Sequence, residues 1–316
     1  MQSSKLVLLR RDFLIPWILA TRPKTLLAII CPILLGLSAV LVEIQEQKLM
    51  LDHIQWSVLP LILICGILIQ IICNFANDLY DHIKGADTKD RIGPERMVQT
   101  GLISPRSMRY ALFILVLITV VIGSILVYIG GWNILLIGLA SIFLAFAYTS
   151  GPFPLSYLGL GEPFVLIFFG PVPVYGTIHL LAGEIGIVNY RLVLYLILSL
   201  GISSISTALM VVNNIRDREQ DIKVNKRTVS VRLGDKLCRY EYFFWLCISA
   251  ITPLITFFLG MTSTVLIIYL VVPYMLNLLF LSWRANSNQQ FADLLSKTAQ
   301  LLPIYSVLLI LALMLS

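Results

Sequence analysis

The sequence predicts an all-α polytopic membrane protein, and three features of its composition lead to that fold class. Of its 316 residues, 58% are hydrophobic and only 13% are charged, whereas a soluble domain carries about twice that share of charge. The charges cluster between long uncharged segments, several of which suffice for one span of about 20 residues. Glycines divide the two longest of these segments. The segments without Lys, Arg, Asp or Glu are 25–42, 58–72, 110–150, 163–182, 192–215, 242–283 and 298–316.

About nine transmembrane helices follow from these segments, because 110–150 and 242–283 are each long enough for two spans. Gly130 and Gly131 divide the first of the two, and residues 260–263 divide the second. We expect one domain, residues 1–316. The expected helices lie near 25–42, 58–77, 109–129, 132–149, 163–182, 192–214, 241–259, 264–283 and 298–316.

The order of these helices suggests an internal pseudo-repeat. Residues 25–150 form a first set of four helices, 163–283 form a second set, and 298–316 form the ninth helix. In each set the second helix ends in an Asn/Asp motif that is followed by a basic loop. We therefore expect one site, which lies between the two halves.

The placement of the basic residues predicts the orientation in the membrane. If the N-terminus is cytoplasmic, every Lys and Arg except Lys48 and Arg191 falls on the cytoplasmic side, as the positive-inside rule requires. We expect an integral protein of the cytoplasmic (inner) membrane with its C-terminus outside and no cleaved signal peptide. The net charge of +6 then reflects orientation and contact with membrane lipid, and nucleic acid is not an expected partner.

The first chemical signal is the stretch NFANDLYDHIKGAD at 74–87, where a long apolar helix ends in acidic and amide side chains. Acidic groups are costly beside a bilayer and usually mark function there. Asn74 and Asp81 stand three or four residues from Asn77 and Asp78, so all four share one helical face. Carboxylate and amide oxygens are the ligands that Mg²⁺ prefers, commonly together with substrate phosphates.

A partner motif, NNIRDREQD at 213–221, closes another long apolar helix. Asn213, Asp217 and Asp221 follow one another at steps of four and share a face. We expect the two acidic helix ends to face each other and to share divalent cations that hold the diphosphate of a lipid substrate. The basic loop that follows offers Lys226 to that diphosphate, although it also fits the positive-inside bias.

Two loops at the same membrane face complete the candidate site. The first follows the first acidic motif and carries Arg96, which suits bidentate contact with phosphate oxygens. The second is GPFPLSYLGLGEP at 151–163, an apolar loop rich in Gly and Pro. Around it Tyr148, Phe153 and Tyr157 are expected either to line a prenyl or aromatic pocket or to anchor at the interface.

Two further groups of residues are less specific signals. Arg22 and Lys24 precede the first span; they either anchor the chain at the cytoplasmic face or reach a diphosphate there. Phe164, Phe168 and Phe169 lie in the fifth span, and a Phe stripe at helical spacing is interpreted as packing.

Four motifs, in order along the chain, resemble the UbiA superfamily of intramembrane aromatic prenyltransferases. The resemblance is to the branch that prenylates 1,4-dihydroxy-2-naphthoate in menaquinone synthesis. One departure is Asn225, where that branch usually has Gly. The motifs are NDLYDHIKGADTKDRIGP (77–94), YTSGPFPLSYLGLGE (148–162), FFGPVPVYGT (168–177) and VNNIRDREQD with KRTVSVRLG (212–234), and RPKTL (22–26) also fits.

This resemblance implies a nine-helix UbiA-type bundle with its active site at the cytoplasmic face, Mg²⁺ as cofactor and a polyprenyl diphosphate donor. It implies transfer of the polyprenyl group to 1,4-dihydroxy-2-naphthoate with loss of CO2 and diphosphate, giving demethylmenaquinone. The base that deprotonates the ring is not indicated. Lys24, Arg96 and Lys226 are the implied diphosphate contacts. The implied metal ligands are Asn77, Asp78, Asp81, Asp87, Asn213, Asp217 and Asp221. Of these, the aspartates Asp78, Asp81, Asp217 and Asp221 are also the implied catalytic groups.

Two alternatives stay open at this point. The acceptor could be another phenolic ring, such as 4-hydroxybenzoate or homogentisate. In a different class, the paired carboxylates could bind the cargo of a cation or metabolite transporter. Against the transporter, the acidic groups gather at one face of the membrane, whereas transporter sites lie near its midplane.

Overall fold

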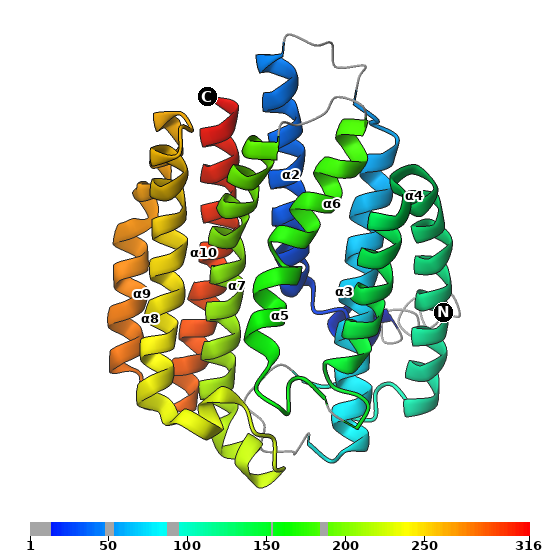
Figure 1. The fold of residues 1–316 in the computed structure, drawn as a ribbon. Coiled ribbons are helices and arrows are strands. Elements are labelled where there is room, and N and C mark those ends of the chain that lie inside the picture. The colour runs from blue at the N-terminus through cyan, green and yellow to red at the C-terminus, as the bar shows by residue number, and fades with distance from the viewer. Residues whose placement is uncertain (1–13, 48–53, 87–94, 153, 184–188) are drawn as a thin grey trace, which may run out of the picture.

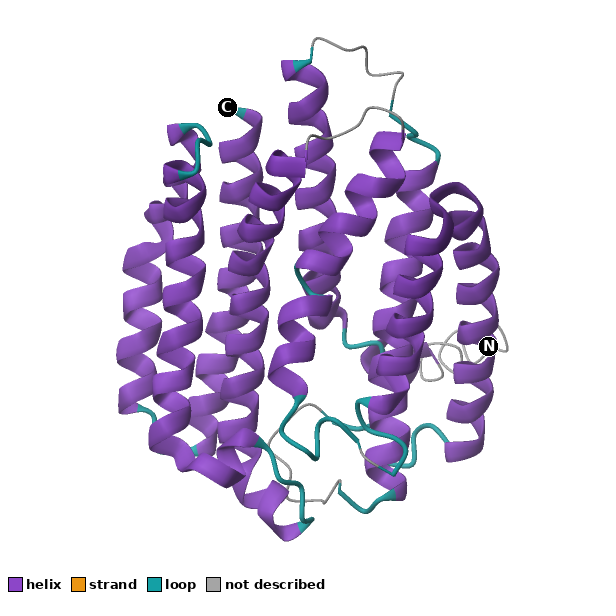
Figure 2. Cartoon of the chain, in the orientation of Figure 1, coloured by secondary structure: helices purple, strands orange, loops and turns teal. Residues whose placement is uncertain are grey.

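The computed structural model describes residues 14–47, 54–86, 95–152, 154–183 and 189–316, and this part of the chain forms helices and loops without a strand (Figures 1 and 2). The elements are η1 (Pro23–Leu26), α2 (Leu27–Glu46), α3 (Val58–Ile83), α4 (Pro105–Ala147), α5 (Gly161–Phe168), α6 (Pro171–Ala182), α7 (Asn189–Lys223), α8 (Val229–Phe258), η4 (Ser263–Val271), α9 (Val272–Arg284) and α10 (Asn288–Met314).

Eight helices in the described ranges are long and apolar enough to cross a membrane. One of them, α4, contains two spans, because Gly131 has non-helical angles of φ 66° and ψ −152° inside its 43 residues. Figure 1 shows α4 as two arms that run in opposite directions from this turn. A positive φ is readily adopted only by glycine. The prediction of about nine membrane helices divided at Gly131 is confirmed, and the chain is an integral membrane protein.

The expected fifth span, 163–182, is broken into α5 and α6 at Gly170. Pro171, the next residue, begins α6 and has no N–H with which to continue the preceding helix. The break also brings the backbone close to α7. A Cβ on Gly170 would lie 2.5 Å from Oγ of Ser203 and 2.8 Å from the carbonyl oxygen of Ser199. The expected eighth span changes without a gap from the 3₁₀ helix η4 to the α-helix α9.

Helix α7 packs against α8, α10, α5 and α6 at the centre of the bundle. Three of its buried hydroxyl side chains, Ser199, Ser203 and Thr207, donate to carbonyls of their own helix, which leaves a surface of small side chains for close packing. The helix continues without a break through the second acidic motif to Lys223. That motif therefore projects from a rigid element instead of a loop.

Replacing Gly201 of α7 by Ala is expected to lower the apparent melting temperature of the detergent-solubilised protein. A Cβ there would lie 2.6 Å from Oγ1 of Thr252 and would also collide with the Tyr305 hydroxyl. Tyr305 is buried and donates to the carbonyl of Ser249 at 2.7 Å. Overpacking of this kind costs about 1–3 kcal/mol. Gly138→Ala is the control, since a Cβ at Gly138 meets no atom within 4 Å; equal melting temperatures for both variants would contradict this account.

The loops fall into two groups at opposite ends of the bundle. Figure 1 shows the connections from α3 to α4, α4 to α5 and α7 to α8 at one end, and the C-terminus at the other. At the C-terminal end, buried Glu43 accepts a hydrogen bond from Tyr195 at 2.7 Å and pairs with Arg191. This contact ties α2 to α7 far from the acidic motifs, which lie at the loop-rich end.

Candidate active site

A cavity of about 490 Å³ lies where α3 and α7 approach the loop-rich end. Its wall combines side chains from both acidic motifs with basic residues that precede α2 and that follow α3 and α7. The predicted site residues that line it are Lys24, Asn77, Asp81, Arg96, Tyr148, Asn213, Asp217 and Lys226. Asp81 and Asp217, 136 residues apart in the sequence, therefore border one space, as the sequence predicts.

Asp81 is the carboxylate that α3 presents to the cavity. It is 4% exposed, and Nη2 of Arg96 lies 3.2 Å from its Oδ2. The hydroxyl of Tyr157 donates to its Oδ1 at 3.4 Å. An arginine of the α3–α4 loop thus compensates this buried carboxylate.

Asp78, one turn away, is used differently. Its Oδ2 accepts a hydrogen bond from the backbone N–H of Met97 at 2.9 Å, and its Oδ1 accepts from Val98 at 3.2 Å. It is 2% exposed and is not part of the cavity wall. Asn74 donates to the carbonyl of Thr21 at 2.8 Å, so it fixes the chain that enters α2. The assignment of Asp78 to the metal stays a prediction.

On α7 the guanidinium of Arg216 donates hydrogen bonds to side-chain oxygens of the second motif. Nε and Nη2 of Arg216 lie 2.7 Å and 2.8 Å from the two carboxylate oxygens of Asp217, and Nη2 lies 2.7 Å from Oδ1 of Asn213. The Arg216 side chain is 2% exposed. Such a bidentate contact is the strong form of a charge-assisted hydrogen bond, so the guanidinium of Arg216 compensates the charge of Asp217.

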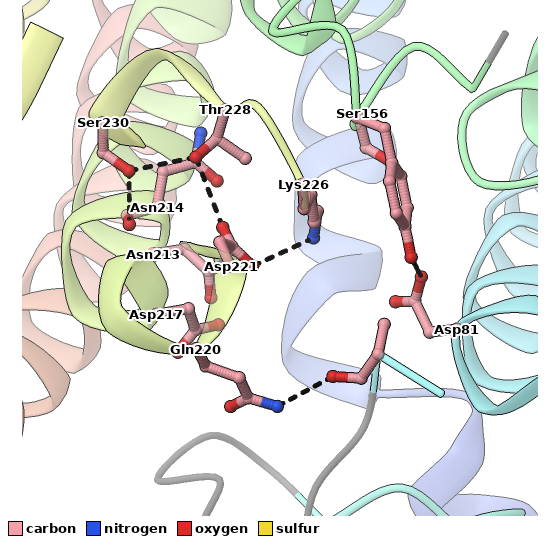
Figure 3. Close-up of polar contacts among 12 residues, drawn as sticks. Asp81, Ser156, Asn213, Asn214, Asp217, Gln220, Asp221, Lys226, Thr228 and Ser230 are labelled. Atoms are coloured by element: carbon pink, nitrogen blue, oxygen red, sulfur yellow. Dashed lines mark hydrogen bonds and ion pairs between the residues drawn. The ribbon is translucent and has the colours of Figure 1, made fainter. Parts of the chain in front are cut away.

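Asp221 lies behind this pair, at the base of the following loop. Lys226 Nζ stands 3.6 Å from its Oδ1 and Thr228 donates to its Oδ2 at 3.3 Å. Figure 3 shows Asp217 and Asp221 projecting from α7 on one side, Asp81 on the other and Lys226 between them. The two acidic helix ends therefore face each other, and Lys226 pairs with the one on α7.

Tyr157 contacts two lysines beside the cavity, Lys84 and Lys226, and is not part of the cavity wall. Its ring lies under two ammonium groups, Lys84 at 4.7 Å and Lys226 at 5.6 Å from the ring centroid. Lys84 also donates to the carbonyl of Thr149 at 2.7 Å. Burial lowers the pKa of Lys84, and the Asp81 carboxylate opposes that shift. Phe153 and Asp87 of the sequence prediction lie outside the described residues.

The donor set suits Mg²⁺. Oδ1 of Asn77 is buried and has no hydrogen-bond partner, and it borders the cavity that Asp81 and Asp217 also line. Within the described ranges no three His, Cys, Asp or Glu side chains form a ready cluster. Mg²⁺ commonly takes one or two carboxylates and completes its shell with water and substrate phosphates, so separated carboxylates on facing helices fit that ion.

A second cavity, of about 410 Å³, adjoins the first and is largely apolar. It lies among α2, α3, α4, α5 and α6, and both cavities are lined by Gln70, Asn77, Tyr148, Val165 and Phe169. Phe164 and Phe168 also line the apolar cavity, and their rings lie beside each other with centroids 6.5 Å apart. Of the three predicted pocket aromatics, Tyr148 reaches both spaces.

Sequence reasoning assigned no role to three residues of the polar cavity wall, Gln70, Glu162 and Arg216. Glu162 had a signal, since it is the one charge in residues 151–163. Arg216 stands inside the second motif and was visible there, but its carboxylate partner depends on the side-chain geometry. Gln70 had no signal, because one amide in a long apolar helix has many uses.

The chain is similar in sequence to a known protein family and to several of its members. Residues 50–302 match the model of the UbiA prenyltransferase family. The chain is 35% identical over 257 residues to 1,4-dihydroxy-2-naphthoate octaprenyltransferase of Haemophilus influenzae, covering 79% of each chain. It is 33% identical to the enzyme of that name from Mycobacterium tuberculosis, covering 72% of each.

A solved structure agrees at the level of the fold. A UbiA homolog from Archaeoglobus fulgidus, bound to DMAPP and Mg²⁺, superposes with a TM-score of 0.59 at 15% identity, covering 93% of this chain and 98% of that one. Membrane helices, facing acidic motifs and the family match over most of the chain agree. The protein belongs to the UbiA prenyltransferase family.

Proposed function

We propose that the protein transfers a polyprenyl group from polyprenyl diphosphate to 1,4-dihydroxy-2-naphthoate within the membrane, with loss of CO2 and diphosphate, to give demethylmenaquinone. The observation that carries this reaction is the junction of a charged cavity with an apolar one at Asn77 and Tyr148. A prenyl diphosphate has this same division into a charged end and an apolar chain. The naphthoate acceptor is supported by the names of the relatives.

The charged cavity binds and orients the diphosphate. Lys24, Arg96 and Lys226 border it from three segments, and cations aimed at departing oxygens stabilise the charge that develops as the allylic C–O bond breaks. Asn77, Asp81, Asn213 and Asp217 would hold Mg²⁺ in this proposal, and the ion would supply Lewis-acid stabilisation of the leaving diphosphate. Asp78, Asp87 and Asp221 remain candidate ligands from the sequence.

The apolar cavity holds the prenyl chain and keeps water from the allylic cation. Its wall is built of aliphatic and aromatic side chains, among them Phe164, Phe168 and Tyr148. Aromatic faces attract cations, and exclusion of water prevents hydrolysis of a reactive intermediate. The electron-rich naphthoate ring then reacts in place of water.

The orientation in the membrane follows from the same site. The loops after the two acidic motifs are rich in Lys and Arg, and the positive-inside rule supports a cytoplasmic position for that end of the bundle. We place the N-terminus in the cytoplasm and the C-terminus outside, in the cytoplasmic (inner) membrane. The diphosphate donor then reaches its site from the cytoplasmic side.

Purified protein tests the reaction directly. With Mg²⁺, a long polyprenyl diphosphate and one acceptor at a time, mass spectrometry should detect a decarboxylated, prenylated product from 1,4-dihydroxy-2-naphthoate. Chelation of the metal should abolish it and Mg²⁺ should restore it. A product from 4-hydroxybenzoate or homogentisate alone would assign another acceptor. No prenylated ring at all, together with ion flux into liposomes, would overturn the proposed reaction.

Replacing Gly123 by Phe is expected to shorten the prenyl chain that the protein accepts. Gly123 lines the apolar cavity, and a Cβ there meets no atom within 4 Å, so a ring at this position fills space that the chain would use. Turnover with a long polyprenyl diphosphate should fall by about tenfold relative to turnover with geranyl diphosphate. Gly123→Ala is the control. Equal losses of turnover with both donors would contradict binding of the prenyl chain in this cavity.

A further inference from the structure

Glu162 is a carboxylate of the charged cavity that belongs to neither acidic motif. It begins the first turn of α5, is 4% exposed and borders the same space as Asp81 and Asp217. The loop that delivers it, 151–163, carries no other charge. A buried carboxylate is costly unless its environment or its function requires it.

The contacts of Glu162 differ from those of the motif carboxylates. Asp81, Asp217 and Asp221 each pair with an arginine or a lysine. Glu162 forms no ion pair within the part of the chain that the structure describes. Its Oε1 accepts one hydrogen bond, from Nδ2 of Asn214 at 3.1 Å. Its negative charge is therefore directed to a neutral donor and not to a cation.

Asn214 is itself held in place by a chain of hydroxyls. Its carbonyl accepts from Oγ of Ser230 at 2.7 Å, and Ser230 and Thr228 lie 3.1 Å apart. Thr228 continues to Asp221, and Figure 3 shows this chain beside the second motif. The bond from Asn214 thus joins Glu162 to the helix that carries the second motif, and a group that acts on the second substrate has to be oriented in this way.

We propose that Glu162 is the base that accepts the phenolic proton of the acceptor ring. This assignment rests on the proposed function, in which an aromatic ring attacks beside the diphosphate. A general base must lie at the reacting ring and be free to take a proton. Asp78, Asp81, Asp217 and Asp221 are engaged by cations or backbone N–H groups. Glu162 instead borders the cavity with an amide as its partner.

The proton and electron balance closes with Glu162 alone. The allylic C–O bond breaks with its electron pair on the diphosphate, and the ring carbon that carries the carboxylate forms the new C–C bond. The adjacent hydroxyl loses its proton to Glu162 and becomes a ketone. Carbon dioxide then leaves, its bonding pair returns to the ring, and Glu162 gives the proton back to that oxygen. The ring stays at the hydroquinone level, so the step needs no oxidant, and the quinone forms on later oxidation.

Glu162→Gln tests the proton transfer with little change in shape. Its amide oxygen still accepts from Asn214, but the side chain no longer takes a proton. Turnover with 1,4-dihydroxy-2-naphthoate should fall by about 10²–10⁴-fold. Binding of Mg²⁺ with a non-reactive thiolo analogue of the donor, measured by calorimetry, should stay at the wild-type value. Glu162→Asp should restore part of the turnover.

Glu46→Gln is the matched control. Glu46 is a carboxylate at the end of α2 that pairs with Arg191 and does not border the cavity, and its replacement should leave turnover near wild type. Two results would overturn the assignment: Glu162→Gln with turnover within about threefold of wild type, or a loss of donor-analogue binding that equals the loss of turnover. A wild-type protein that prenylates no aromatic ring would instead refute the proposed function, before any variant is compared.

Discussion

Replacing Arg216 by Gln is expected to destabilise the metal-free protein and to tighten its binding of Mg²⁺ in the absence of donor. Arg216 contacts both carboxylate oxygens of Asp217 and the amide oxygen of Asn213. These are the oxygens that the proposed metal uses, so guanidinium and metal compete for them. Removal of one partner of a buried ion pair costs about 3–5 kcal/mol, because the other charge is left without compensation.

Thermal unfolding and Mn²⁺ binding together measure this effect. Without divalent metal the apparent melting temperature of Arg216→Gln should fall below that of wild type, and addition of Mg²⁺ should recover most of the loss. Manganese, followed by electron paramagnetic resonance, should bind the variant more tightly. Arg216→Lys keeps the charge but loses the bidentate contact and should lie between the two proteins.

Arg218 supplies a control two residues away. It pairs with Asp235 at 3.4 Å, and its side chain is 33% exposed, so water screens the pair and its contribution is small. Arg218→Gln should change metal affinity little. If Arg216→Gln and Arg218→Gln had the same metal affinity and the same metal-dependent stability, the competition at Asp217 would be refuted.

The membrane fold was predictable because its signals are local in the sequence. Charge-free length defines a span, and glycine at 131 marks the turn inside α4 where a positive φ is required. The convergence of Asp81 and Asp217 was also predictable, since each motif ends an apolar helix and carries costly charges on one face. The break at Gly170 was not, because it depends on the approach of Ser203 from another helix.

The roles of individual site residues were less predictable for the same reason. Sequence spacing places Asp78 and Asp81 on adjacent parts of one helix, but the backbone that meets Asp78 belongs to a loop about 20 residues later. Tyr157 was expected in a pocket wall, and two lysines from different loops lie over its ring instead. Residue type and spacing identify a site, whereas the partner of each group depends on the tertiary structure.

Replacing Asp78 by Asn is expected to reduce turnover as strongly as replacing a residue of the cavity wall. The cause would be the loss of contact between Asp78 and the α3–α4 loop. Each carboxylate oxygen accepts one backbone N–H, from Met97 and Val98. Asn presents one oxygen and one NH2 group, so one of the two N–H groups would meet a donor and lose its partner. Hydrogen bonds to a charged group contribute about 1.5–3 kcal/mol each, and the same loop presents Arg96 to the cavity.

Asp81→Asn separates this role from metal binding, because Asp81 borders the cavity and Asp78 does not. A loop anchor predicts that Asp78→Asn lowers the melting temperature and keeps the wild-type dependence of residual turnover on Mg²⁺ concentration. Asp81→Asn should shift that dependence to higher Mg²⁺. If Asp78→Asn produced the same shift with an unchanged melting temperature, Asp78 would act on the metal, and its bonds to residues 97 and 98 would have to open when the metal binds.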